Sequence, residues 1–265
     1  MPTIKINDVN IYYEIHGKGE PLVLIAGLAS DSQSWLPIID DLSKKYQVVV
    51  FDNRGVGRTK PMDVKTSIQQ LADDCIGLIN YLGFKTVQLL GHSMGGMIAL
   101  DCAIRYPEYF SKLILASTSA VNSQRNTILF DDWVSYLDDN MKSELWFRNL
   151  FYWIFTKRFF EDSETLKTAV QMSIDYPYAQ SKVSYKNQVN AIKEFDCFEE
   201  LSGIKIKTLV VSGDEDMLFS PDESYSVLKT IPGAKFSFVE GAAHSIFMEK
   251  PDEFVKVVND FLNNI

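Results

Sequence analysis

The sequence has few cysteines, few histidines and no long apolar run. No stretch approaches the roughly 18 apolar residues that a transmembrane helix needs, so we expect no membrane span. The N-terminal segment alternates like a strand and carries no signal-peptide apolar stretch. The three cysteines, Cys75, Cys102 and Cys197, are widely spaced, which predicts reduced thiols in a cytoplasmic protein and no metal site of the C-x-x-C kind.

Positive charge is also scarce. The formal net charge is −9 at pH 7, which argues against nucleic acid and anionic membrane surfaces as general partners. Hydrophobic residues make up 46% of the 265 positions, enough apolar material for the core of one large domain.

Short apolar runs alternate with amphipathic segments along most of the chain. We expect strands at 3–6, 9–15, 21–26, 47–51, 85–90, 112–116, 207–212 and 235–239, and helices at 32–42, 66–82, 97–106, 221–230 and from Pro251 onward. The central runs are apolar without interruption, as in strands buried on both faces of a parallel sheet. The pattern therefore predicts an α/β fold with a doubly wound, mostly parallel central sheet.

The alternation stops at about residue 120 and resumes after residue 190. The intervening segment is rich in aromatic residues and has no strand pattern. We therefore expect a core of residues 1–120 and 191–265, with residues 121–190 forming a helical cap over an apolar pocket. The candidates for the pocket wall are Trp133, Trp146, Phe151, Trp153 and Phe155, although any of these rings could instead pack only within the cap.

A serine between glycines lies at the junction of an expected strand and helix. The run Gly91-His92-Ser93-Met94-Gly95-Gly96 fits the nucleophile-elbow pattern G-x-S-x-G. Such a turn strains the central residue and places its hydroxyl at a helix N-terminus, where free amides favour an anion. The motif predicts that Ser93 is a nucleophile.

A serine nucleophile needs a base, and the base needs an acid to orient it. Only three histidines exist: His92 adjoins the serine, His16 lies in an early turn, and His244 follows the last expected strand. His244 lies at the carboxyl edge of the sheet, as does the elbow, and is the predicted base. Among Asp214, Glu215 and Asp216 after the preceding strand, Asp216 is placed best to reach it, which predicts the order Ser93, Asp216, His244.

The chain resembles the α/β-hydrolase superfamily, in a serine-esterase-like form with a helical cap. The resemblance runs from about residue 11 to the C-terminus and rests on the elbow, Phe51-Asp52-Asn53-Arg54-Gly55, Gly213-Asp214-Glu215-Asp216 and Gly241-Ala242-Ala243-His244. It implies an oxyanion hole formed by the backbone amides of Leu28 and Met94. It also implies that Arg54 tethers its own loop. Many relatives carry His-Gly where this chain has Ala26-Gly27. The backbone donor at Leu28 survives this change, whereas the resemblance does not extend to the anchoring of its loop.

The resemblance implies hydrolysis of a carboxylic ester through an acyl-enzyme intermediate, without a cofactor or metal. Serine at position 93 argues against dehalogenases and epoxide hydrolases of this fold, which use aspartate there. Carboxylesterase, lactonase, carbon–carbon bond hydrolase, perhydrolase and acyltransferase activities remain open. We expect a small ester with an apolar half as the substrate.

Two other functions remain possible. Residues 142–158 carry Lys142, Arg148, Lys157 and Arg158 against Glu144, so an acidic acyl carrier protein could dock there, as for a pimeloyl-carrier methyl esterase. The alternative is an ordinary solvated helix face. The second possibility is a receptor on the same scaffold that binds a small ligand without catalysis, which the retained Ser, Asp and His argue against.

Overall fold

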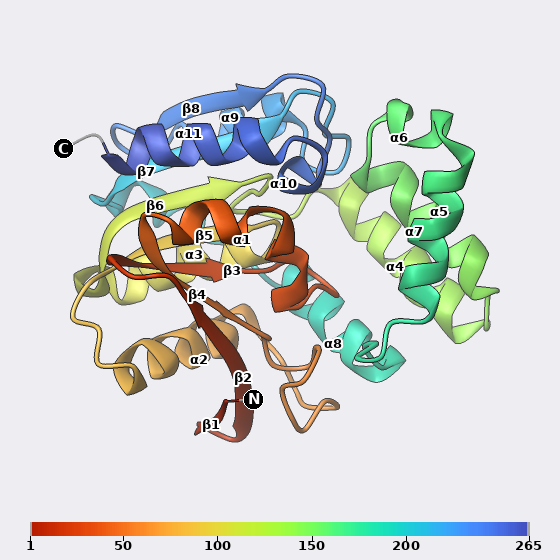
Figure 1. Ribbon diagram of the computed structural model, residues 1–265, viewed down its shortest axis with the longest axis horizontal. Coiled ribbons are helices and arrows are strands. Elements are labelled where there is room, and N and C mark those ends of the chain that lie inside the picture. The colour runs from red at the N-terminus through yellow and green to blue at the C-terminus, as the bar shows by residue number, and fades with distance from the viewer. Residues whose placement is uncertain (1, 264–265) are drawn as a thin grey trace.

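A computed structural model describes residues 2–263, which form an eight-stranded sheet in the order β1-β2-β4-β3-β5-β6-β7-β8 (Figure 1). The strands are β1 Thr3–Ile6, β2 Val9–His16, β3 Glu20–Ile25, β4 Tyr46–Phe51, β5 Val87–His92, β6 Phe110–Ala116, β7 Lys207–Gly213 and β8 Lys235–Val239. Strands β1 and β2 pair antiparallel, and β3 to β8 run parallel. The predicted α/β architecture is confirmed.

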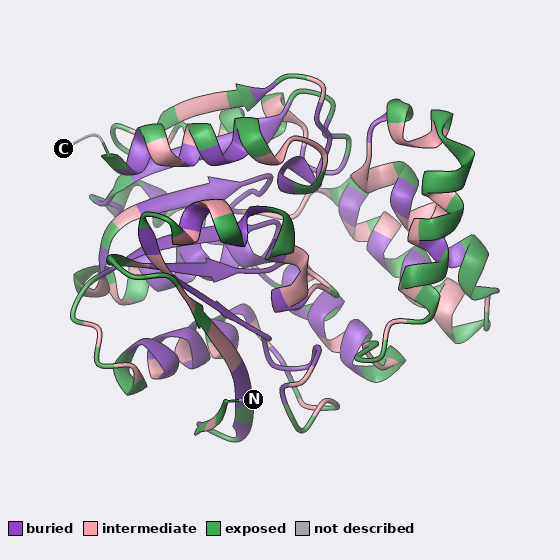
Figure 2. Ribbon diagram, in the orientation of Figure 1, coloured by how far each residue is buried: buried purple, intermediate pink, exposed green. Residues whose placement is uncertain are grey.

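Alternate residues of the central strands point into two separate apolar layers. Leu22, Leu24 and Val50 pack with α1 (Leu36–Ser43), α10 (Ile246–Glu249) and α11 (Pro251–Asn263). The residues that alternate with these point to the other face of the sheet and pack with α2 (Ile68–Tyr81), α3 (Met94–Arg105) and α9 (Pro221–Leu228). Figure 2 shows the central strands buried along most of their length and the helices buried on one side. This double burial is why the strands read as continuous apolar runs.

Five helices separate β6 from β7. They are α4 Gln124–Asp138, α5 Ser143–Ile154, α6 Lys157–Glu161, α7 Ser163–Ile174 and α8 Lys182–Lys193. Figure 1 places α4 to α7 beyond the ends of the sheet toward which the parallel arrows point. The expected cap, 121–190, ends inside α8, which continues to Lys193. We call residues 121–193 the helical insertion.

Several element boundaries differ from those expected. The helix expected at 97–106 begins at Met94, because Gly95 and Gly96 pack within its first turn instead of preceding it. The segment 32–42 divides into a 3₁₀ turn, Ser32–Trp35, and α1, whose second residue is Pro37. Short 3₁₀ turns also occur at Pro107–Tyr109 and Leu201–Gly203.

Across residues 2–263, no helix combines the length and apolar character needed to cross a membrane. All three cysteines are free and buried, and Cys75 and Cys102 lie fully inside the core.

Candidate active site

Ser93 occupies a strained turn between β5 and α3. Its backbone has φ 56° and ψ −122°, a conformation that costs on the order of 1–3 kcal/mol for a non-glycine residue. The surrounding packing enforces it. A Cβ added to Gly91 would lie 2.1 Å from the carbonyl oxygen of Gly95, and one added to Gly95 would lie 2.1 Å from that of Ile25. Only glycine fits at these two positions, so the sequence motif follows from the closeness of strand and helix.

The carbonyl of Ser93 is held from two sides. The Gly96 amide and the Thr118 hydroxyl donate to it at 2.9 and 2.7 Å. Met94 begins α3, and the first amides of a helix have no partner within it. Met94 and Leu28, the two residues predicted to form an oxyanion hole, both line the cavity that Ser93 faces.

The segment after β3 is anchored by side-chain amides. Asn53 donates to the carbonyl of Ala26 at 3.1 Å, and the amide of Ala29 donates to the side-chain oxygen of Gln188 at 3.2 Å. These contacts account for the departure at Ala26-Gly27, because the segment is fixed without a histidine there. Sequence patterns could not reveal the contact between Ala29 and Gln188, which lie 159 residues apart.

Arg54 lies in the loop that supplies Asn53. Its side chain is 2% exposed, and its guanidinium forms two hydrogen bonds with Asp74 of α2, at 2.6 and 2.9 Å. It also donates to Asp8 at 2.8 Å. The structure therefore places Arg54 as a tie between this loop and α2, away from the cavity wall.

His244 and Asp216 are paired. His244 Nδ1 lies 3.0 Å from Asp216 Oδ2, and both side chains are buried. The amides of Leu218 and Phe219 donate to the other carboxylate oxygen at 2.8 and 2.9 Å. Burial opposes ionisation of Asp216, but His244 and these hydrogen bonds outweigh it and hold the pKa of the carboxyl below its usual value. The carboxylate therefore fixes His244 with Nδ1 protonated, which leaves Nε2 free to accept a proton.

The two competing acids lie elsewhere. Asp214 accepts a hydrogen bond from the Gly241 amide at 2.7 Å, and Glu215 is exposed. The structure thus brings Asp216, and neither of its neighbours, to the predicted base.

The other two histidines have different partners. His16 pairs with Glu14 at the far end of β2. His92 is buried, packs edge-on against Phe247 and donates from Nε2 to the carbonyl of His244 at 2.9 Å. Burial, together with the proximity of His244, lowers the pKa of His92 to about 3. His92 is therefore neutral at pH 7 and holds the His244 loop.

The buried His92 predicts a pH-dependent stability. The unfolded chain protonates this histidine near pH 6.5, its ordinary pKa, whereas the folded protein does so near pH 3. Between these values the unfolded state binds more protons, so stability falls as the pH drops, by up to about 1.4 kcal/mol per pH unit. His92→Gln keeps a hydrogen-bond donor but does not titrate. Between about pH 6 and 4.5 we therefore expect its free energy of unfolding to depend less steeply on pH than that of the wild type, by about the contribution of one proton. Urea unfolding of both proteins across this pH range measures the difference, and equal slopes of unfolding free energy against pH would contradict the prediction.

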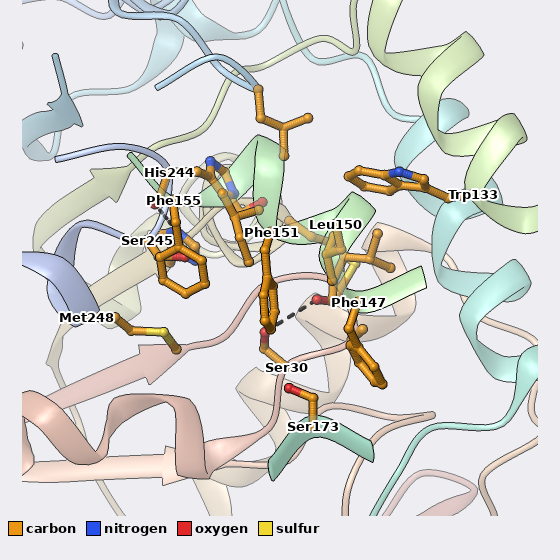
Figure 3. Close-up of a pocket in the computed structure, with 18 of the residues that line it drawn as sticks. Ser30, Trp133, Phe147, Leu150, Phe151, Phe155, Ser173, His244, Ser245 and Met248 are labelled. Atoms are coloured by element: carbon orange, nitrogen blue, oxygen red, sulfur yellow. Dashed lines mark hydrogen bonds between the residues drawn. The ribbon is translucent and has the colours of Figure 1, made fainter. Parts of the chain in front are cut away.

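A cavity of about 460 Å³ joins Ser93 and His244 to the helical insertion. Trp133, Trp146, Phe151 and Phe155 line it, and Figure 3 shows the side chains of α5 entering between Trp133 and the His244 loop. The prediction for Trp153 is wrong. Trp153 is not among the residues that line the cavity, because it lies at the margin of the α5 face that meets it. Its ring lies 6.0 Å from the Arg125 guanidinium.

The sequence interpretation missed much of the wall. It also includes Phe130 of α4, Phe147, Leu150 and Ile154 of α5, Met172 and Ser173 of α7, Tyr185 of α8, and Phe219 and Met248 from the core. The α5 contributors follow helical spacing, a signal present in the sequence. No Asp, Glu, Lys or Arg occurs in the wall that residues 2–263 form.

With this geometry in place, comparison with known proteins identifies the family. The model of the alpha/beta hydrolase fold matches residues 20–251. The chain belongs to the α/β-hydrolase family. Its sequence is 27% identical to RutD of Rhizobium rhizogenes, which carries the provisional name carbamate hydrolase, over 95% of this chain and 97% of that protein.

Two further α/β-hydrolase relatives cover most of the chain. Serine hydrolase BPHL of Mus musculus is 25% identical over 98% of this chain and 85% of its own length. The crystal structure of the enol-lactonase from Burkholderia xenovorans LB400 superposes with a TM-score of 0.89, at 25% identity over 99% of this chain and 100% of that one. The chain is thus similar over nearly its whole length to proteins named for hydrolysis.

Proposed function

We propose that this α/β hydrolase cleaves carboxylic esters through an acyl-enzyme intermediate on Ser93. One observation carries the proposal: Ser93, in its strained turn, and His244, which is paired with Asp216, line one cavity. Serine attack on a carbonyl uses such a base and such an orienting acid.

Each residue has a distinct role in the proposed reaction. Ser93 Oγ attacks the ester carbonyl while His244 Nε2 takes its proton, and Asp216 stabilises the resulting imidazolium. The amides of Leu28 and Met94 hold the negative oxygen of the tetrahedral intermediate. His244 then gives its proton to the leaving alcohol and later activates the water that releases the acid. These steps need no cofactor.

The cavity wall favours a neutral substrate with an apolar half. Aromatic and aliphatic side chains dominate it, and within residues 2–263 no Asp, Glu, Lys or Arg side chain lines it. An ionised carboxylate placed there would lose its water without gaining a cationic partner, at a cost of several kcal/mol. Lactones, which are cyclic esters, and carbamates could undergo the same attack, and relatives carry both names.

A matched pair of esters tests this preference. p-Nitrophenyl hexanoate and the mono-p-nitrophenyl ester of adipic acid differ in whether the far end of the acyl chain is a methyl or a carboxylate. We expect kcat/KM to be at least about 100-fold higher for the hexanoate, because the carboxylate would be buried unpaired. Equal values would contradict the neutral-substrate assignment. A γ-lactone and an aryl carbamate, added to the panel, rank the alternative substrates.

A carrier-protein-bound acyl chain is the second candidate substrate. Lys142, Lys157 and Arg158 are exposed on the helical insertion, whereas Arg148 lies 3.7 Å from Glu144. An acidic carrier could contact the exposed cations. Charge reversal at Lys157 and Arg158 should then lower kcat/KM for a carrier-linked ester and leave the free ester unaffected. Equal activity on the carrier-linked ester would remove this candidate.

A further inference from the structure

One buried amide side chain joins three segments around the predicted oxyanion hole. Gln188 lies on α8 and is fully buried. Its oxygen accepts from the backbone amide of Ala29 at 3.2 Å and from the side chain of Gln180 at 3.1 Å. Its nitrogen donates to the carbonyl of Arg54 at 3.2 Å. The Gln188 side chain thus ties the segment after β3 to α8, at the end of the helical insertion.

The segment it fixes has an unusual backbone. Ala29 has φ 57°, in the left-handed region that favours glycine. Its amide and the carbonyl of Leu28 belong to one peptide plane. Gln188 holds the amide end, and the Ser30 hydroxyl donates to the carbonyl end at 3.3 Å. Holding this plane fixes the rotation about the adjoining bond of Leu28, whose own amide is a predicted oxyanion donor.

We propose that Gln188 is a positioning residue that sets the direction of the Leu28 amide toward the oxyanion. Gln188 is absent from the cavity wall, so it would act through the backbone and not on the substrate. The assignment rests on the proposed ester hydrolysis. It also predicts that the placement of α8 and the oxyanion hole depend on each other, since Gln188 belongs to α8 and bonds to the segment that carries the Leu28 amide.

Other hydrogen bonds also join the helical insertion to the core. Ser184, one turn before Gln188, donates to the carbonyl of Gly55 at 2.6 Å. Tyr176, between α7 and α8, donates to the carboxylate of Asp31, which lies two residues after Ala29. The helical insertion is therefore bonded to the core at Asp31, two residues after Ala29, and at Gly55, next to Arg54.

Steady-state kinetics of Gln188→Met on p-nitrophenyl hexanoate tests the proposal. Methionine fills the space but accepts no comparable hydrogen bond from Ala29. We expect kcat to fall by about 10- to 100-fold, somewhat less than for complete loss of an oxyanion donor. KM should stay within about threefold. Binding of phenylboronic acid, which forms a tetrahedral adduct with an active serine, should weaken in parallel with kcat.

Ser184→Ala is the matched control. It removes a buried hydrogen bond of the same helix to a loop other than the oxyanion segment, and kcat should stay within about threefold. If Gln188→Met does not fold, Gln188→Asn, which is one methylene too short to reach Ala29, carries the same expected loss. A Gln188→Met enzyme with kcat within threefold of the wild type, or an equal loss in Ser184→Ala, overturns the assignment.

The wild-type protein separates this outcome from failure of the proposed function. A wild type that hydrolyses the ester and reacts with a fluorophosphonate, beside an unaffected Gln188→Met, overturns only the role of Gln188. A wild type that does neither overturns the proposed function, and the assignment of Gln188 with it.

Discussion

Ser93→Ala is expected to lower kcat for ester hydrolysis by about 10⁵- to 10⁶-fold. Removing the serine of a serine triad costs about as much as removing all three members, because the groups act as a unit. The remaining backbone amides can polarise the carbonyl, so a small residual rate should persist. Initial rates with p-nitrophenyl hexanoate measure the effect, at enzyme concentrations high enough to detect this residual rate.

Ser173→Ala is the control for this result. Ser173 lines the same cavity, and its hydroxyl donates to the carbonyl of Ala169 at 2.9 Å. Its removal should change kcat by less than about tenfold. Thermal unfolding should show both variants folded, since neither hydroxyl is expected to support the core. A Ser93→Ala enzyme within tenfold of the wild type would exclude Ser93 as the nucleophile.

Asp216→Asn is expected to lower kcat by about 10³- to 10⁴-fold. The amide oxygen can still accept from the amides of Leu218 and Phe219, so the loop should keep its shape. The other oxygen, which faces His244 Nδ1 at 3.0 Å, becomes a nitrogen that donates. The imidazole then favours the wrong tautomer and its cation loses a stabilising charge, which is the physical source of the loss.

Asp214→Asn provides the matched comparison. It neutralises an acid in the same turn, one whose contact is with the Gly241 amide. Activity should stay within about tenfold of the wild type. Losses of similar size in the two variants would mean that the turn responds to any lost charge, and Asp216 would have no special role.

Much of the fold follows from local patterns. The central strands are buried on both faces, so their apolar runs were unbroken and easy to recognise. The elbow was equally visible, since only glycine fits at Gly91 and Gly95. The choice of His244 and Asp216 needed one further step, the knowledge that carboxyl ends of parallel strands share an edge.

Contacts between distant segments could not be predicted in this way. Ala29 and Gln188 meet across 159 residues, and neither belongs to a recognisable motif. Within α5, the wall consists of residues 146, 147, 150, 151 and 154, whereas Trp153 falls at the margin of that face. The prediction from the sequence applied no helical register, and it included Trp153 and omitted Phe147.

Mass spectrometry of the enzyme quenched during turnover tests the central claim most directly. A burst of p-nitrophenyl hexanoate hydrolysis, stopped with acid within milliseconds and digested, should yield the peptide containing Ser93 with one added hexanoyl group. The same peptide from Ser93→Ala should be unmodified. An acyl group on a different residue, or an enzyme that turns over without acylation and leaves a fluorophosphonate unreacted, would contradict an acyl-enzyme on Ser93.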